Sequence, residues 1–205
     1  MAQVVGLISD THGVLLPEAV RALSAATGTI IHAGDIGEPR YKSRLKASDL
    51  VEELETGTGS KVVAVTGNVD DNCPETVALY PAFRTLRLFD RKFLVIHICG
   101  FPPAVDPRAA DIIAAEHPDV VVFGHSHVPG AELHEGTLYI NPGSAGPVRF
   151  RLPQCIAVLH FDGEYCVRFI RLGSSNNKLM ALPINVKLLY DSKAGCFELD
   201  RPKIR

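Results

Sequence analysis

Seven side chains that carry oxygen or imidazole donors follow short apolar stretches of the sequence. They are Asp10, His12, Asp35, Asn68, His97, His125 and His127. Carboxylate, amide and imidazole groups without a thiolate suit Mn, Fe, Co or Zn better than Ca or a structural zinc. Two divalent cations held by two aspartates and neutral ligands would keep a charge of about +2. Such a centre would attract a phosphate oxyanion.

Each of these residues, taken alone, has a simpler interpretation. Asp10 or Asp35 could cap a helix or stabilise a turn, Asn68 could be a turn residue, and His97 could be a buried histidine of the core. The last two histidines could form a polar cap on a sheet edge. Independent caps and turns would not be expected to place two Asp, one Asn and four His at successive strand ends, so we favour a common site.

The spacing within two of the motifs has a geometric meaning. Residues i and i+2 of an extended segment point to the same side, about 6.6 Å apart. Asp10 with His12, and His125 with His127, would then form two claws. Such claws suit a pair of metal ions roughly 3.5 to 4 Å apart.

The elements that must position these residues alternate between strands and helices. Short apolar runs predict buried strands that begin at Gln3, Thr29, Lys61, Lys92 and Asp119. Apolar stripes at helical spacing predict helices around Leu16–Leu23, Leu50–Leu54 and Ala109–Ile113. The alternation predicts an α/β core, in which functional groups gather beyond the carboxyl ends of the strands.

The second half of the chain changes character. Glu135-Gly136 and Asp162-Gly163 are turn pairs flanked by strand formers, and they predict two antiparallel hairpins. We therefore expect two sheets packed face to face with helices outside. The run GSSNNK predicts a linker, so we expect a domain over residues 1–172 and an appendage of unknown role, a strand pair or a docked arm, over 173–205.

Composition excludes several classes of partner. The net charge is −2 and the 21 basic residues are scattered, so no broad positive face is expected for nucleic acid or a membrane surface. Five widely spaced cysteines without a CxxC pair favour a reduced, cytoplasmic setting. We expect no signal sequence at the N-terminus and no membrane span, because no apolar run approaches the roughly 20 residues required.

The ordered motifs resemble those of the calcineurin-like metallophosphoesterases. These motifs are Asp10-Thr11-His12, Gly34-Asp35, Gly67-Asn68, His97, Gly124-His125-Ser126-His127 and the YINPGS run at 139–144. The resemblance covers residues 3 to 172 and points to the small single-domain branch of bacterial and archaeal phosphodiesterases. It implies a metallo-dependent phosphatase-like fold, which is a four-layer α/β/β/α sandwich of two mixed β-sheets flanked by helices.

The resemblance also implies a dinuclear centre. Asp10, His12, Asp35 and His127 would hold one divalent ion, and Asp35, Asn68, His97 and His125 the other, with Asp35 bridging. We expect Mn first, with Fe, Zn, Ni or Co as alternatives, and a metal-bridging hydroxide that attacks phosphorus. Asp35, Asn68 and His97 would contribute to catalysis by positioning the metal and the phosphate, and no residue is assigned as the general acid.

Two positions depart from the family pattern. Val69 stands where many members have a histidine that assists the leaving group, so we expect a preference for esters with good leaving groups. The HICG run at 97–100 replaces the common HG or HGH, which can change the loop beside the second metal. Asp70 is expected to orient its loop, the Asn-Pro-Gly turn at 141–143 to shape the loop under the site, and Arg149 to be a surface charge.

Three functions from different classes fit these observations. The first is a metal-dependent phosphoesterase, most simply a phosphodiesterase, acting on a small phosphate ester. The second is a noncatalytic protein-binding scaffold. A eukaryotic retromer subunit resembles this family in fold, has a degraded metal site and uses its surface to bind a partner. The third, a nuclease, lacks a basic groove or an aromatic platform in the sequence. The sequence does not specify the oligomeric state, and it is compatible with a homodimer or a higher homo-oligomer.

Overall fold

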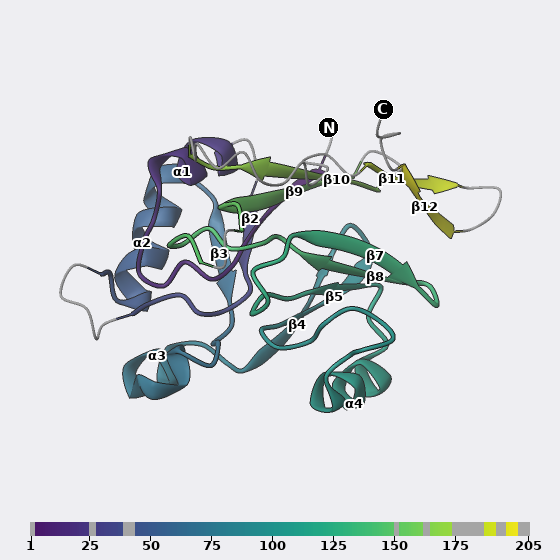
Figure 1. Cartoon of the computed structure of the whole chain (residues 1–205), viewed down its shortest axis with the longest axis horizontal. Coiled ribbons are helices and arrows are strands. Elements are labelled where there is room, and N and C mark those ends of the chain that lie inside the picture. The colour runs from purple at the N-terminus through teal and green to yellow at the C-terminus, as the bar shows by residue number, and fades with distance from the viewer. Residues whose placement is uncertain are drawn as a thin grey trace.

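Two five-stranded sheets stack face to face and carry helices on their outer faces (Figure 1). The computed structural model describes residues 3–24, 28–38, 44–149, 152–161, 165–173, 187–191 and 196–200 of the 205-residue chain. Both sheets mix parallel and antiparallel pairs. The predicted four-layer α/β/β/α sandwich is therefore confirmed.

The first sheet has the strand order β10-β9-β1-β2-β3. Its strands are β1 (Gln3–Ile8), β2 (Thr29–His32), β3 (Lys61–Ala64), β9 (Cys155–Phe161) and β10 (Tyr165–Arg171). β1, β2 and β3 run parallel, while β9 pairs antiparallel with β1 and with β10. The predicted hairpin of β9 and β10 is present, and its turn at 162–164 lies outside the described residues.

The second sheet has the strand order β4-β5-β6-β8-β7. Its strands are β4 (Phe83–Leu88), β5 (Arg91–Ile96), β6 (Val120–Val122), β7 (Gly130–His134) and β8 (Thr137–Asn141). The central β5, β6 and β8 are parallel, and the edges β4 and β7 are antiparallel to their neighbours. The Glu135-Gly136 turn joins β7 to β8 as predicted.

Helices cover the outer face of each sheet. On the first sheet, α1 (Pro17–Leu23) and α2 (Ala47–Thr58) bury Leu23 and Leu54 against strand residues such as Ile30. On the second sheet, α4 (Pro107–Glu116) buries Ala109. Pro107 opens α4, because a proline at the first helical position loses no hydrogen bond there. All three helices were predicted from their apolar stripes.

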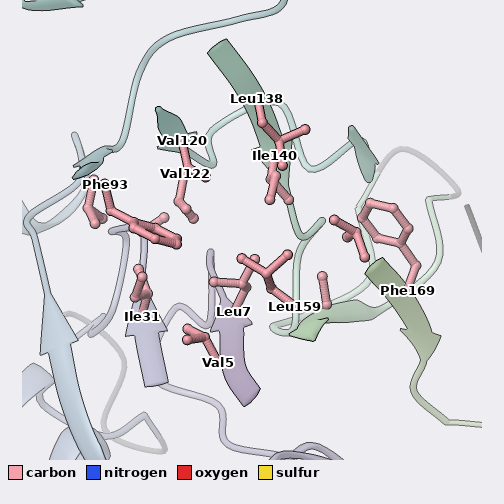
Figure 2. Close-up of a cluster of buried hydrophobic side chains, with 14 of the residues drawn as sticks. Val5, Leu7, Ile31, Phe93, Val120, Val122, Leu138, Ile140, Leu159 and Phe169 are labelled. Carbon is pink, nitrogen blue, oxygen red and sulfur yellow. The ribbon is translucent and has the colours of Figure 1, made fainter. Parts of the chain in front are cut away.

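The main core lies between the two sheets. Figure 2 shows Leu7 and Ile31 of the first sheet pointing toward Phe93, Val122 and Ile140 of the second. All five side chains are fully buried. Because the central strands are covered on both faces, they read as continuous apolar runs rather than as an alternating pattern.

Three elements between residues 70 and 88 were not predicted. They are the 3-10 turn η1 (Asp70–Asn72), the helix α3 (Pro74–Leu79) and the edge strand β4. The turn and the helix are too short to show a period, and β4 leaves Phe83, Arg84 and Arg87 exposed. An exposed edge strand with two arginines lacks the apolar run by which the other strands were recognised.

Within the described part of the tail, β11 (Lys187–Asp191) and β12 (Cys196–Asp200) form an antiparallel pair. This pair matches one of the two arrangements expected for the tail, and β11 lies beside β10 (Figure 1). Of the predicted linker, only Gly173 lies within the described residues.

Two expectations about the chain as a whole can be compared with the structure. None of the described helices has both the length and the apolar character that crossing a membrane requires. Cys73, Cys99, Cys155 and Cys166 are free thiols.

Candidate metal centre

The carboxyl ends of five strands, three in one sheet and two in the other, bring the seven predicted residues together. In the first sheet, β1 leads into Asp10 and His12, β2 into Asp35, and β3 into Asn68. In the second sheet, β5 leads into His97, and β6 into His125 and His127. Direct contacts, described below, link all seven. The expectation that strand ends deliver these side chains to one place is met.

The backbone achieves this convergence in a way that the sequence did not predict. Five of the seven residues have a left-handed backbone, with φ of 54° at Asp10, 47° at His12, 52° at Asp35, 67° at His125 and 59° at His127. The two claws are therefore not extended segments, and that prediction is wrong. A left-handed non-glycine residue is uncommon and costs roughly 1 to 3 kcal/mol, so such residues cluster where function holds them.

Hydrogen bonds from neighbouring loops hold the left-handed loop after β1. The amide of Asp10 donates to the carbonyl of Gly34 at 3.0 Å, and the amide of His12 donates to that of Asp35 at 2.9 Å. The carbonyl of Asp10 accepts from Ser144 Oγ at 3.0 Å and from the amide of Gly146 at 3.1 Å. The loop conformation is thus fixed by contacts from outside the loop.

The carboxylates of Asp10 and Asp35 lie at the middle of the cluster. Oδ1 of Asp10 is 3.2 Å from Nε2 of His127 and 3.9 Å from Nε2 of His97. Oδ2 of Asp35 is 3.4 Å from Nε2 of His97 and 3.8 Å from Nε2 of His12. Each carboxylate therefore lies close to two histidines, and His97 is common to both.

Asn68 completes the cluster on its exposed side. Its Oδ1 lies 3.2 Å from Nε2 of His97 and 2.8 Å from Nδ1 of His125. The rings of these two histidines meet edge to face at 5.3 Å between centroids. One amide oxygen thus faces two imidazoles, as a shared ligand position would require.

The donor set fits a cation at two overlapping positions. Ligand atoms of Asp10, His12 and His127 lie within 4.8 Å of one another, and so do those of Asp10, Asp35 and His97. Both ring nitrogens of His12 are buried without a hydrogen-bond partner. Because a buried polar atom without a partner is costly, a metal ligand role for His12 would account for this arrangement.

His97 is oriented for ligation by its other ring nitrogen. Its Nδ1 donates to the carbonyl of Ala33 at 2.8 Å, which directs Nε2 toward the carboxylates. Burial lowers the pKa of His97, but the hydrogen bond to Asp35 and the charges of Asp10 and Asp35 outweigh it and raise the pKa to about 9. The same contact with His97 holds the pKa of Asp35 below its usual value, against the opposing effect of burial. Without metal, protonated His97 is the cation that these carboxylates face.

Asp70 ties the loop after β2 to the loop after β3. Its carboxylate accepts hydrogen bonds from the amides of Ile36, Gly37 and Gly67 at 2.9 to 3.1 Å. Burial nevertheless raises the pKa of Asp70, because these bonds offset only part of the desolvation. The prediction that Asp70 orients its loop is confirmed.

Asn141 performs a similar task below the loop after β6. Its Nδ2 donates to the carbonyl of Gly124 at 2.8 Å and to Ser126 Oγ at 3.0 Å, and its Oδ1 accepts from the amide of Gly143. The Asn-Pro-Gly turn therefore shapes the loop that carries His125 and His127, as predicted.

Glu38 is a residue of the site that the sequence did not reveal. Its side chain is only 4% exposed, and its Oε2 lies 3.9 Å from Nδ1 of His12 and 3.7 Å from Arg149. Arg149, expected to be a surface charge, thus forms an ion pair with Glu38 beside the site. A single Glu in the loop after Asp35 gives no periodic or motif signal by which this role could be found.

The helix-cap interpretation of the aspartates does not hold. The N-cap residues of α1 and α2 are Leu16 and Lys46, and neither forms a side-chain cap hydrogen bond. Asp10 and Asp35 therefore cap neither helix that follows them. His32 is a core histidine: it is fully buried, its Nε2 contacts Thr11 Oγ1 at 2.8 Å, and burial lowers its pKa to about 3.

Comparison with known proteins agrees with this geometry. The family model described as the calcineurin-like phosphoesterase superfamily domain matches residues 4–164. The chain is 44% identical over 175 residues to the probable metallophosphoesterase YsnB of Bacillus subtilis, covering 80% of this chain and 88% of that protein. It is 30% identical over 163 residues to the phosphodiesterase YfcE of Escherichia coli K12, covering 75% and 85%.

A solved structure with a different described role shares the fold. Vacuolar Protein Sorting 29 from Cryptosporidium parvum superposes with a TM-score of 0.64 at 22% identity, covering 84% of this chain and 93% of that one. At this identity the likeness concerns the fold alone. The family match over most of the chain, together with two relatives at 30% identity or more, shows that the chain belongs to the calcineurin-like phosphoesterase superfamily.

Proposed function

We propose that this protein is a metal-dependent phosphoesterase that hydrolyses a small phosphate ester, with phosphodiesters as the preferred class. The observation that carries the proposal is the meeting of seven oxygen and nitrogen donors from five strand ends around Asp10 and Asp35. The relative YfcE, named a phosphodiesterase, supports the choice of ester.

The proposed ligand sets share residues at the middle of the cluster. Asp10, His12, Asp35 and His127 would hold one divalent cation, and Asp35, Asn68, His97 and His125 the other. The position of Asp35 between His12 and His97 supports a bridging role. Asp10 also faces His97, so it stands close to both positions. When bound, two such ions would supply Lewis acidity and lower the pKa of water to give a hydroxide nucleophile near neutral pH.

The charge of the site favours a phosphate group. Two divalent ions and two aspartates would leave about +2. Glu38 would reduce this charge, but Arg149 lies 3.7 Å from it and balances it. An anionic ester would therefore be attracted and its transferring oxygens stabilised.

The side chain that follows Asn68 gives no help to the leaving group. The side chain of Val69 has no proton to give to a leaving group, and its backbone amide donates to Oδ1 of Asp35 at 2.8 Å. This residue holds the carboxylate in place rather than protonating an alkoxide. We therefore expect faster hydrolysis of esters with acidic leaving groups.

The test is a metal and substrate panel with the full-length protein. Protein stripped with a chelator is assayed with bis(p-nitrophenyl) phosphate after addition of Mn, Ni, Zn or Mg, and its metal content is measured. We expect turnover that depends on the added metal, with Mn first, and that is abolished in Asp35→Ala. Stoichiometric metal binding without hydrolysis of any ester would overturn the proposal.

The scaffold function is the second candidate, and the exposed apolar residues Val77, Leu79 and Phe83 of α3 and β4 favour it. The vacuolar sorting protein shows that the fold also occurs in a protein named for sorting. A chain that binds metal and hydrolyses nothing, yet retains a protein partner that Leu79→Asp releases, would favour this candidate.

We further propose residues 1–172 as the catalytic domain and residues 173–205 as an appendage, and we expect the cytoplasm as its compartment. The family match ends at residue 164, and β10 continues the first sheet to Arg171 by pairing with β9, which supports a boundary after β10. Deletion of residues 173–205 is expected to leave diesterase activity in place.

A further inference from the structure

A cavity of about 290 Å³ opens beside the proposed metal centre. Asn68 and His97, which belong to the proposed second metal position, form part of its wall. Further parts of the wall come from the loop after β3, the turn η1, the start of β4, the end of β5 and the segment after it, and the helix α4. A group attached to a phosphorus atom at the metals could therefore enter it directly.

The wall of this cavity is largely apolar and includes apolar side chains that are exposed to solvent. Phe83 and Ile98 are 40% and 38% exposed, and Ile96 and Ile112 lie beside them. Ile98 belongs to the HICG run, which departs from the family pattern. Apolar side chains exposed at a concave site, next to a few polar groups, are typical of ligand pockets.

The charges at the rim favour an uncharged occupant. Asp71, Asp106 and Arg108 line the cavity and together carry one net negative charge. Asp106 caps α4 by accepting from the amides of Arg108 and Ala109. A second phosphate or a carboxylate on the substrate would meet this negative charge, whereas a neutral ring would meet apolar carbon.

The size of the cavity limits the occupant to a small group. Its volume is at the low end of the range of roughly 300 to 1,000 Å³ found for sites that hold drug-sized ligands. It has room for one or two rings, and a nucleic acid strand would not enter it.

We propose that this cavity, formed by Phe83, Ile98, Ile112 and the wall of Asn68 and His97, binds an uncharged, ring-sized organic substituent of the phosphoester. This inference rests on the proposed function and names its substrate class as aryl or similarly flat apolar esters. The preference for the organic group then comes from the apolar side chains Phe83, Ile98 and Ile112.

The test measures binding rather than turnover. Methylphosphonate and phenylphosphonate present the same anionic group to the metals and differ only in the organic group. Calorimetric titration of the Mn-loaded protein is expected to show phenylphosphonate binding about tenfold more tightly, because burial of the ring removes apolar surface from water. In Phe83→Ala and in Ile98→Ala the ratio of the two affinities is expected to fall close to one.

A matched control comes from another exposed apolar residue. Leu79 of α3 is 60% exposed and does not line the cavity, so Leu79→Ala should keep the tenfold ratio. Metal content is measured for every variant before titration. A 4-carboxyphenylphosphonate is expected to bind more weakly than phenylphosphonate.

The outcomes separate this inference from the proposed function. Equal affinities for the two phosphonates, or a ratio that persists in both cavity variants, would overturn the inference and leave the phosphoesterase proposal standing. Tighter binding of the carboxylated ring would overturn the assignment of an uncharged occupant. If neither phosphonate binds the metal-loaded protein, the proposed function fails and the inference fails with it.

Discussion

Nε2 of His97 lies 3.4 Å from Oδ2 of Asp35, while Nδ1 of the same ring donates to a backbone carbonyl. In the metal-free protein this pair is a buried imidazolium facing a carboxylate. A divalent cation bound by Asp35 and His97 would replace the proton on Nε2, because a histidine must be neutral there to ligate. Folding of the metal-free protein therefore favours a proton on Nε2 of His97, whereas metal binding requires its loss.

The first prediction concerns the pH dependence of stability. The pKa of His97 is raised from 6.5 to about 9, so its contribution to the stability of metal-free protein is full below pH 6.5 and is lost as pH rises through 9. The lowered pKa of Asp35 gives a contribution that is lost as pH falls below its ordinary value of 3.8. Metal affinity should rise with pH over the range in which the stability of metal-free protein falls.

Urea unfolding with a chelator present, from pH 5 to 10, checks this prediction. The decline in the free energy of unfolding between pH 6.5 and 9 should be smaller in His97→Gln, which carries no titrating ring. An unchanged decline in this variant would show that other groups cause it.

The second prediction concerns Asp70, which joins two ligand-bearing loops. Asp70→Asn replaces one acceptor oxygen with an amide donor that faces backbone N–H groups, so we expect the free energy of unfolding to fall by about 2 kcal/mol. Mn affinity should also fall, because Asp35 and Asn68 lie on the two loops that Asp70 connects. Chemical denaturation and metal titration measure both effects.

The neighbouring Asp71 provides the control for stability. Its side chain is exposed, and Asp71→Asn should change the free energy of unfolding by no more than about 0.5 kcal/mol. Equal effects of the two substitutions would contradict the role given to Asp70.

The third prediction concerns the close approach of Gly67 to Asp35. A Cβ atom at Gly67 would overlap Oδ1 and the backbone nitrogen of Asp35. Gly67→Ala must therefore displace the proposed bridging ligand, and we expect diesterase activity to fall roughly a hundredfold. Gly59→Ala is the control, because a Cβ there meets open space; with φ of 69° it should cost about 1 kcal/mol of stability and leave activity unchanged. Full activity of Gly67→Ala would argue against Asp35 as a fixed ligand.

Much of the fold was predictable from the sequence because its central strands are buried on both faces. Such strands give apolar runs, and the polar residues that end them stand out at once. β4 is exposed, and its sequence FRTLRL lacks that contrast. Whether such a segment forms an edge strand depends on the strand with which it pairs, and its own sequence does not specify that partner.

The site was predictable in composition but not in conformation. Residue types indicated the seven donors, whereas the left-handed backbone at Asp10 and His12 is held by contacts with distant loops. Glu38 was missed for the same reason, since its position beside His12 exists only in the folded chain.

The last prediction concerns Val69 and the leaving group. Valine cannot donate a proton, so hydrolysis by the natural chain should slow steeply as the leaving group becomes more basic. Val69→His introduces an imidazole next to Asn68, and it should raise the rate with alkyl leaving groups by roughly a hundredfold while changing p-nitrophenyl esters little. Rates across a series of substituted phenyl and alkyl diesters give the dependence on leaving-group pKa for each variant. Val69→Gln, which is polar but cannot transfer a proton near neutral pH, should keep the steep dependence of the natural chain. If Val69→His keeps it as well, protonation of the leaving group does not limit the reaction at this site.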